Sequence, residues 1–381
     1  MDSSDSMDDG GKITLFDEDL WSLFDNDTEN NTYDDSCCED MGDVCTQGVG
    51  LGFQRLFLPA LYSVALVLGV LGNGLVIAVL CQFRRGWSVT DTFILNLALA
   101  DTLLVVTLPF WAAGAVRGWI FGTGMCKILG TIFKVNFFCG IFLLACISLD
   151  RYLSIVHAVH MYSRRKPWAV RVSCLCVWTL CFLLAVPDLL FLEALSDNRR
   201  GGRVECSHNY LRFTNNSSDW RLASRAVYHV MGFFAPSLVM VYCYACILLT
   251  LRKSQGAQKQ KAIRIILALV VAFFLCWTPY NLTLLADTLH SQSNISDSCG
   301  RRTALDISLV ATSSLGYLHC CLNPILYAFV GVKFRRNLLE LLRALGCKIK
   351  GHARPKPASS SATRRTSMWS ESGDVSYSTG I

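Results

Sequence analysis

Seven long apolar segments limit the folds open to this chain more than any other feature. Each has about twenty residues or more with few charges, and at a rise of roughly 1.5 Å per residue it can cross a hydrocarbon layer about 30 Å thick. The segments span residues 57–80, 92–111, 126–152, 172–192, 226–251, 265–286 and 307–332. Because lipid offers backbone polar groups no partner, each segment must be helical. The sequence therefore predicts an all-α membrane protein with a seven-transmembrane helix bundle.

The charge distribution indicates a chain whose two ends meet different partners. Of the 381 residues 52% are hydrophobic and only 17% are charged, whereas soluble proteins carry about 25% charged residues. The net charge of +6 conceals an acidic start, because residues 1–54 hold fifteen Asp or Glu and one base, Lys12, for −14, which leaves +20 on the remainder. This asymmetry predicts partners of opposite charge at the two ends.

The connectors predict which side of the membrane each end occupies. Basic residues gather in alternate connectors, around Arg84 and at 164–166, 252–264 and 333–336, and the positive-inside rule makes that face cytoplasmic. The connector 193–225 opposes this assignment, since it carries six Arg. Glycosylation sequons support it, because five fall on the expected outer side: Asn26, Asn30, Asn215, Asn216 and Asn294. The start of the chain has neither the basic nor the apolar region of a signal peptide, so we expect the first apolar segment to direct insertion, with the N-terminus outside.

These patterns divide the chain into four parts. We expect an acidic extracellular tail at 1–54, the helix bundle at 55–332, an amphipathic helix on the inner membrane surface at 333–347 and a disordered cytoplasmic tail at 348–381. The last part is rich in Ser and Thr and open to phosphorylation. Cys347 is a palmitoylation candidate, and an unmodified thiol is the alternative.

An acid within the second segment is the first candidate functional residue. Asp101 alone would cost on the order of 2.5–3.5 kcal/mol to insert, so it requires partners inside the bundle. Asn73, Asn136 and Asn323 lie at comparable depths on other segments and predict a polar cluster. The cluster has two interpretations: a water or monovalent-cation site that holds an inactive state, and a structural hydrogen-bond knot.

A proline frees a carbonyl and kinks a helix. Besides Pro59 near the start of the first segment, five segments carry one: Pro109, Pro187, Pro236, Pro279 and Pro324. Two of these occur in the sequences Cys276-Trp277-Thr278-Pro279 and Asn323-Pro324-Ile325-Leu326-Tyr327. An aromatic residue close to a kink predicts a bistable element, which a transmitter of signals needs.

A charged triplet, Asp150-Arg151-Tyr152, ends the third segment at its inner face. A cation there can pair with its neighbouring acid in one state and with a cytoplasmic partner in another. The plain alternative is an interfacial arginine that extends to water.

Together these motifs resemble the rhodopsin-like G-protein-coupled receptors. The set comprises GN in the first segment, LALAD in the second, DRY ending the third, Trp178 in the fourth, Pro236 in the fifth, then CWTP and NPILY, and it covers roughly residues 55–345. Within that class, Thr107-Leu108-Pro109, DRYLSIVHA and HCCLNPILYAFVGVKFR are similar to the chemokine receptors, and FLPALYS and ALADTLLVVTLPFWA resemble their CXC branch.

The resemblance implies two disulfides, Cys126 to Cys206 and Cys45 to Cys299, and an outer ligand pocket. Ligands of the family are small basic proteins, here CXC chemokines, which the acidic tail would steer; Tyr33 in that tail has a sulfation context. The pocket would be lined by Trp111, Phe133, Asp188, Asp287, Ser313 and Tyr317, with the two acids receiving a cationic ligand N-terminus. Ser313 and Gly114 depart from the family pattern, because many relatives have Glu at the first position and some have an acid at the second.

On the inner face, the resemblance implies that Arg151, Tyr244, Lys261 and Tyr327 rearrange to admit a G protein of the inhibitory class. The expected protein is a plasma-membrane receptor for interferon-inducible CXC chemokines that drives leukocyte chemotaxis and calcium mobilisation. Receptor kinases and arrestin would act on the C-terminal tail. We expect no enzymatic activity, cofactor, metal or nucleic-acid partner.

Other classes fit the sequence less well. A transporter is disfavoured by the odd number of segments and the lack of an internal repeat. A retinal protein needs a lysine in the seventh segment for its Schiff base, and 307–332 contains none. The nearer rival is an atypical chemokine receptor that internalises its ligand without G-protein signalling. Such receptors tend to have an altered DRY motif, so the intact motif favours signalling.

Overall fold

The structure, a computed structural model, describes residues 48–84, 87–157, 167–198, 201–212, 217–253, 257–292, 299–330 and 332–344. Several residues singled out above lie outside this part of the chain: Asn26, Asn30, Tyr33, Cys45, Asn215, Asn216, Asn294 and Cys347. Lys261 and Cys299 lie on described helices, but the description does not extend to their side chains.

Seven helical spans among the described residues are long and apolar enough to cross a membrane, which confirms the predicted fold class. They cover Gln54–Gln82, Val89–Arg117, Gly122–Ile155, Trp168–Phe191, Ser218–Arg252, Ile266–Ser291 and Gly300–Ala328. Each predicted segment falls on one span. Most spans extend past the apolar run, because a helix continues into the polar interface while its apolar part stays in lipid.

Ten described α-helices build the spans, together with one π-helical turn in the fifth span. The α-helices are α1 (Gly48–Gln82), α2 (Val89–Val105), α3 (Leu108–Arg117), α4 (Gly122–Ile155), α5 (Pro167–Leu184), α6 (Val186–Phe191), α7 (Ser217–His229), α8 (Ala235–Lys253), α9 (Ala257–Gln292) and α10 (Cys299–Val330). The second span breaks between α2 and α3 and the fourth between α5 and α6. Pro109 and Pro187 follow these breaks, because a proline lacks the N–H that would continue the ladder. Pro279 and Pro324 lie inside unbroken helices.

The fifth span begins earlier than the sequence predicts. Its helix starts at Ser217 instead of residue 226, continues through a π-helical turn, η6 (Val230–Phe234), and goes on as α8. The polar first turns carry Arg221 and Arg225, two of the six arginines assigned above to the connector. The apolar criterion missed these turns because many of their residues are polar or charged.

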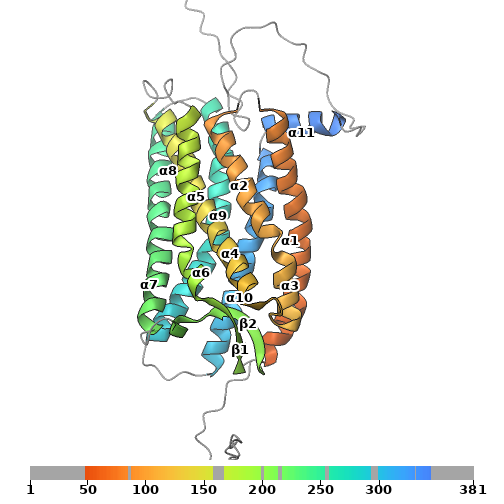
Figure 1. Ribbon diagram of the computed structural model, residues 1–381. Helices are drawn as coiled ribbons and strands as arrows, with labels where there is room; N and C mark the ends of the chain where they lie inside the picture. Colours follow the sequence, from red (N-terminus) through yellow and green to blue (C-terminus); the bar gives the residue numbers. More distant parts are fainter. Residues whose placement is uncertain are drawn as a thin grey trace, which may run out of the picture. The chain divides into compact units, whose positions relative to one another are not determined.

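The third span, α4, is the central helix of the bundle. It packs against α2, α5, α8 and α9, and also against the outer hairpin (Figure 1). Its inner half supplies much of the main core, including Phe137, Phe138 and Ile141. A displacement at one end of this helix therefore reaches most of the other spans.

Opposite ends of the bundle carry different structures. At one end an antiparallel hairpin of β1 (Leu192–Asp197) and β2 (Arg203–His208) lies across the helix ends, and η5 (Tyr210–Arg212) follows it (Figure 1). At the other end α11 (Val332–Ala344) lies beside α1. The sequence reasoning did not foresee the hairpin. It did foresee α11, where Phe334 is buried while Arg335 and Arg336 are exposed, so the helix is amphipathic as predicted.

Candidate functional site

A cavity of about 570 Å³ opens at the hairpin end of the bundle. All six pocket residues proposed from the sequence line it: Trp111, Phe133, Asp188, Asp287, Ser313 and Tyr317. They come from five different spans, so the cavity exists only because the helices converge there. Its volume lies in the range of about 300–1,000 Å³ that is typical of ligand pockets.

The hairpin that roofs this end is fixed to α4 and its neighbours. A disulfide joins Cys126 at the start of α4 to Cys206 on β2, as the family resemblance implied. On the other side of β2, the guanidinium of Arg203 donates to the carbonyls of Gly114 and Ala115 at 3.2 Å each. Both groups belong to the last turn of α3, where the carbonyl of Gly114 also accepts from the N–H of Gly118 at 2.9 Å.

The outer end of the fourth span is held to α4 in the same way. The ammonium of Lys127 donates to the carbonyls of Leu189 and Leu190 at 2.9 and 2.8 Å. These carbonyls belong to the last turn of α6, which the break at Ala185 has separated from α5. The hairpin and α6 therefore form one rigid frame around the cavity.

Both acids proposed as ligand partners already have partners within the cavity. Asp287 Oδ2 lies 2.6 Å from Arg225 Nη1, and Asp188 Oδ1 lies 3.0 Å from His208 Nε2. A cationic ligand group would have to displace one of these partners. Arg221 and Arg225 of α7 line the cavity and belong to the site. The sequence did not predict this, because both arginines were assigned to the connector 193–225.

The cavity floor is aromatic. The ring of Phe133 lies 5.8 Å from Trp277, 6.2 Å from Tyr280 and 5.1 Å from Tyr317, centroid to centroid. Trp277 is buried and fits against Gly316 of α10, where a Cβ atom would lie 2.7 Å from the indole. A ligand that moves Phe133 therefore pushes on Trp277, which lies two residues before Pro279.

Below the floor, Asp101 is the centre of a buried polar cluster. Asn136 and Asn323 donate to its two oxygens at 3.0 and 2.8 Å. Asn73 was expected to join them, but its amide donates instead to the carbonyls of Gly69 and Cys320 at 3.0 Å each. It therefore supports the cluster through α10 without touching Asp101.

The same cluster contains the atoms best placed to hold a small cation. Asp101, His319 and Cys320 bring one ligand atom each within 4.8 Å of one another, and all three residues are buried. Among the described residues, the imidazole Nε2 of His319 and the amide Oδ1 of Asn323 have no hydrogen-bond partner in this region. The cluster therefore retains unused polar atoms for a water or an ion.

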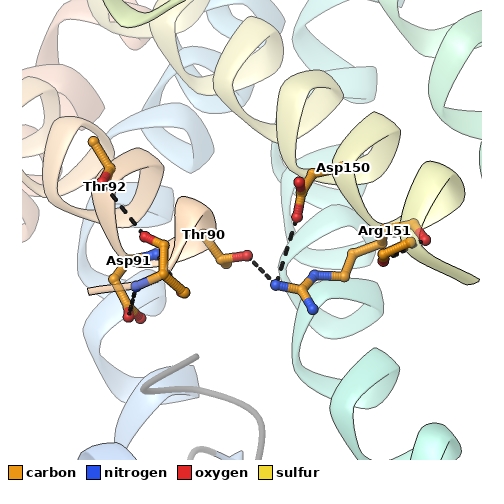
Figure 2. Close-up of polar contacts among 7 residues, drawn as sticks. Thr90, Asp91, Thr92, Asp150 and Arg151 are labelled. Carbon is orange, nitrogen blue, oxygen red and sulfur yellow. Dashed lines mark hydrogen bonds and ion pairs between the residues drawn. The ribbon is translucent and has the colours of Figure 1, made fainter. Parts of the chain in front are cut away.

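At the inner end of α4, Arg151 lies between two helices. Its guanidinium is 3.7 Å from Asp150 and donates a hydrogen bond to the hydroxyl of Thr90 on α2 (Figure 2). Thr90 belongs to the first turn of α2, which a capping box fixes: Ser88 N donates to the carboxylate of Asp91 at 2.7 Å, and Asp91 N donates to the Ser88 hydroxyl at 3.2 Å. The arginine is thus held inside the bundle.

The tyrosines proposed from the sequence lie around this end. Tyr244 on α8 is buried, with its hydroxyl 3.4 Å from that of Ser148. Tyr327 on α10 is buried against Phe334 of α11, with ring centroids 6.3 Å apart. Tyr152 instead lies at the edge, where its hydroxyl meets the ring of His157 at 3.1 Å.

The architecture and the two ends define a seven-helix membrane receptor. Residues 72–327 match the 7 transmembrane receptor (rhodopsin family), and the chain belongs to this family and, within it, to the chemokine receptors. Members of this class are receptors and not enzymes.

Relatives are similar over nearly the whole chain. C-X-C chemokine receptor type 3 from Capra hircus is 49% identical across 92% of this chain and 92% of its own length. The type 3 receptor from Homo sapiens is 49% identical across 90% of each chain. C-X-C chemokine receptor type 2 from Homo sapiens is 46% identical across 78% of this chain and 81% of its own. The resemblance read from the sequence motifs, which are most like those of type 3 receptors, is confirmed.

Proposed function

We propose that the chain is a plasma-membrane receptor for basic CXC chemokines of the interferon-inducible type, which activates heterotrimeric G proteins of the inhibitory class. The contacts of Arg151 support the G-protein part of this proposal, and the similarity to type 3 receptors supports the ligand class. One carboxylate and one hydroxyl hold Arg151 at the inner end of the helix whose outer end lines the cavity. Both contacts can exchange for contacts with a protein. Leukocyte chemotaxis and calcium mobilisation would follow from G-protein activation.

On the outer side, the cavity would receive the ligand's N-terminal segment. A cationic group on that segment would replace Arg225 at Asp287 or His208 at Asp188. The acidic tail 1–54, with Tyr33 as a sulfation candidate, would raise the encounter rate with a basic ligand. The bridge from Cys45 to Cys299 would fix this tail to α10. The outer sequons named above would carry glycans.

On the inner side, opening of the bundle would release Arg151 and rearrange Tyr244, Lys261 and Tyr327 around the G protein. Asp101 and its neighbours would bind a water or a monovalent cation in the resting state. α11 would lie on the inner leaflet, with a palmitoyl group on Cys347. The tail 348–381 would serve receptor kinases and then arrestin.

The central test is a panel of chemokines against a G-protein activation assay in cells that express the receptor. An interferon-inducible CXC chemokine should give a response that a toxin specific for the inhibitory class abolishes. Arg151→Gln should abolish nucleotide exchange while chemokine binding remains. Arg252→Gln, which removes an exposed arginine from the same face, should leave both intact.

The rival function predicts a different pattern. Chemokine-dependent internalisation with no G-protein response would identify a scavenging receptor and overturn the proposal. Steering is tested separately by deletion of residues 1–35, which should slow association and flatten its dependence on salt. An unchanged association rate would contradict that role of the tail.

A further inference from the structure

A lysine lies inside the cavity, and neither the sequence motifs nor the family resemblance gave it a role. Lys134 is on α4 one residue after Phe133, and it lines the cavity with the residues described above. The signal was present in the sequence, because an isolated lysine well inside an apolar span is rare and tends to be functional. The sequence reasoning examined only the acids of the spans and passed over it.

Lys134 has no direct contact with an anion in the described part of the chain, although the carboxylate of Asp188 acts on its charge from beyond ion-pair distance. Its Nζ lies 4.1 Å from the ring centroid of Tyr228 and 5.9 Å from that of Tyr280. Among the described residues, no carboxylate lies within ion-pair distance of it and no acceptor hydrogen-bonds to it. A contact with an aromatic face offsets only part of the loss of water from an ammonium group.

The acids that could neutralise Lys134 are engaged elsewhere. Asp188 contacts His208 and Asp287 contacts Arg225, while Asp306 also has an interaction of its own. The cavity lining as a whole contains four Lys or Arg against three Asp, so cations are in excess even before His208 is counted. Two of these cations, Lys134 and Arg221, have aromatic rings as their described side-chain contacts, and the guanidinium of Arg221 lies 5.8 Å from the ring of Tyr210. Of the two, Lys134 lies deeper in an apolar span.

A second unused donor lies next to this lysine. Tyr228 also lines the cavity, is 6% exposed, and has a buried hydroxyl with no hydrogen-bond partner among the described residues. Asn281 lies beside it without meeting hydrogen-bond geometry. Both residues line the cavity, and neither the ammonium of Lys134 nor the buried phenol hydroxyl of Tyr228 has an acceptor at hydrogen-bond geometry among the described residues.

We propose that Lys134 and Tyr228 form a carboxylate-binding subsite in the outer cavity, and that the receptor therefore favours ligands with an acidic group within the segment that enters it. The inference rests on the proposed function for the identity of the natural ligand, but the subsite itself does not depend on signalling. A carboxylate has two acceptor oxygens, so one could accept from the ammonium of Lys134 and the other from the hydroxyl of Tyr228. The aromatic floor around Phe133 and Tyr280 would pack the apolar part of the same ligand.

The first experiment uses purified receptor and small probes, so that it does not depend on a chemokine or a G protein. Binding of 3-phenylpropanoate and of its neutral amide is compared by saturation-transfer NMR and thermal shift. The wild type should prefer the carboxylate by about tenfold, because a charge-assisted hydrogen bond is lost with the amide. Lys134→Gln and Lys134→Met should both reduce that preference to about one. Arg117→Gln makes the same change in net charge on an exposed outer residue and should retain it.

The second experiment uses the strongest agonist found in the chemokine panel, with its N-terminal segment carrying either one Glu or one Gln. The Glu form should be about tenfold more potent on the wild type and equally potent on Lys134→Gln. Lys134→Glu should reverse the preference when the Glu of the agonist is replaced by Lys. Tyr228→Phe should weaken the preference without removing it.

The outcomes separate the two proposals. Equal binding of acid and amide to the wild type, or a preference that survives Lys134→Gln in folded receptor, would overturn the subsite whatever the receptor signals through. Small-probe selectivity without any chemokine response would support the subsite and contradict the proposed function. Selectivity for the small acid with no difference between the Glu and Gln agonists would refute the inference that the subsite selects among chemokines.

Discussion

The two ends of α4 are built in opposite ways. At the outer end a covalent bond, Cys126–Cys206, and hydrogen bonds from Lys127 and Arg203 tie the hairpin and neighbouring helices together. At the inner end, the described contacts of the Arg151 guanidinium are with two side chains, Asp150 and Thr90. The difference teaches that one helix can keep its ligand-facing end fixed while its other end changes partners. Ligand binding then costs little reordering, and the exchange of contacts occurs where the G protein would bind.

Removal of the disulfide should have the largest effect, and it acts on the outer end of α4. In Cys126→Ser or Cys206→Ser, loss of a bridge that closes 80 residues should lower stability by about 2–5 kcal/mol and abolish chemokine binding. Thermal unfolding of purified receptor and surface expression measure the effect. Cys176→Ser changes an exposed free cysteine and should be neutral. Full chemokine affinity in either disulfide variant would show that the frame is not needed.

Gly316→Ala tests the link between the two ends. The added methyl would lie 2.7 Å from the Trp277 ring, so the indole must move or α10 must shift. Overpacking of this kind costs about 1–3 kcal/mol and should change basal nucleotide exchange while the outer frame still binds chemokine. Gly74→Ala, on α1 with nothing within 4 Å of the new atom, is the matched control. Identical basal activity in both variants would contradict a lever at Trp277.

Thr90→Val tests the contact between Thr90 and Arg151 at the inner end of α4. It removes the hydroxyl that accepts from Arg151 and preserves the shape of a fully buried side chain. Hydrogen bonds to charged groups contribute about 1.5–3 kcal/mol, so the resting state should weaken and basal exchange should rise several-fold. Thr92→Val, whose hydroxyl bonds to the carbonyl of Ser88 instead, should not raise it (Figure 2). A fall in basal exchange after Thr90→Val would mean that this contact serves the active state.

Lys127→Gln should have the smallest effect. The two hydrogen bonds to Leu189 and Leu190 are exposed to solvent, so together they should contribute less than about 1 kcal/mol. We expect a slightly lower unfolding temperature and a chemokine dissociation rate raised no more than a few-fold. Arg171→Gln, on the exposed part of α5, provides the reference. A large loss of binding would show that α6 depends on this one cation.

The sequence predicted what depends on composition and on local pattern. The number of spans and the amphipathic α11 follow from apolar runs and helical spacing. The prolines were expected to kink five helices; the helix breaks just before Pro109 and Pro187 and continues through Pro279 and Pro324. The six cavity residues and the Cys126–Cys206 pair came from family resemblance, and the structure brings each set together. Their proposed roles in binding remain predictions.

What the sequence did not predict depends on distant pairs. The hairpin carries no strong alternation, and its position is set by Cys206 and Arg203, whose partners lie on α4 and α3. The ion pair of Arg225 with Asp287 joins two spans across 62 residues, so no local pattern reveals it. Asn73 has the depth expected of a partner for Asp101, but its orientation on α1 directs its amide to backbone carbonyls of α1 and α10.

The capping box that starts α2 has a consequence for receptors that carry no ligand. Ser88 and Asp91 fix the first turn of α2, and that turn positions the hydroxyl to which Arg151 donates. A change at Ser88 would therefore alter the fraction of receptors that are active without a ligand, although Ser88 has no described contact with Arg151 and does not line the cavity. The basal signal of the receptor would then depend, in part, on how well the first turn of α2 is capped.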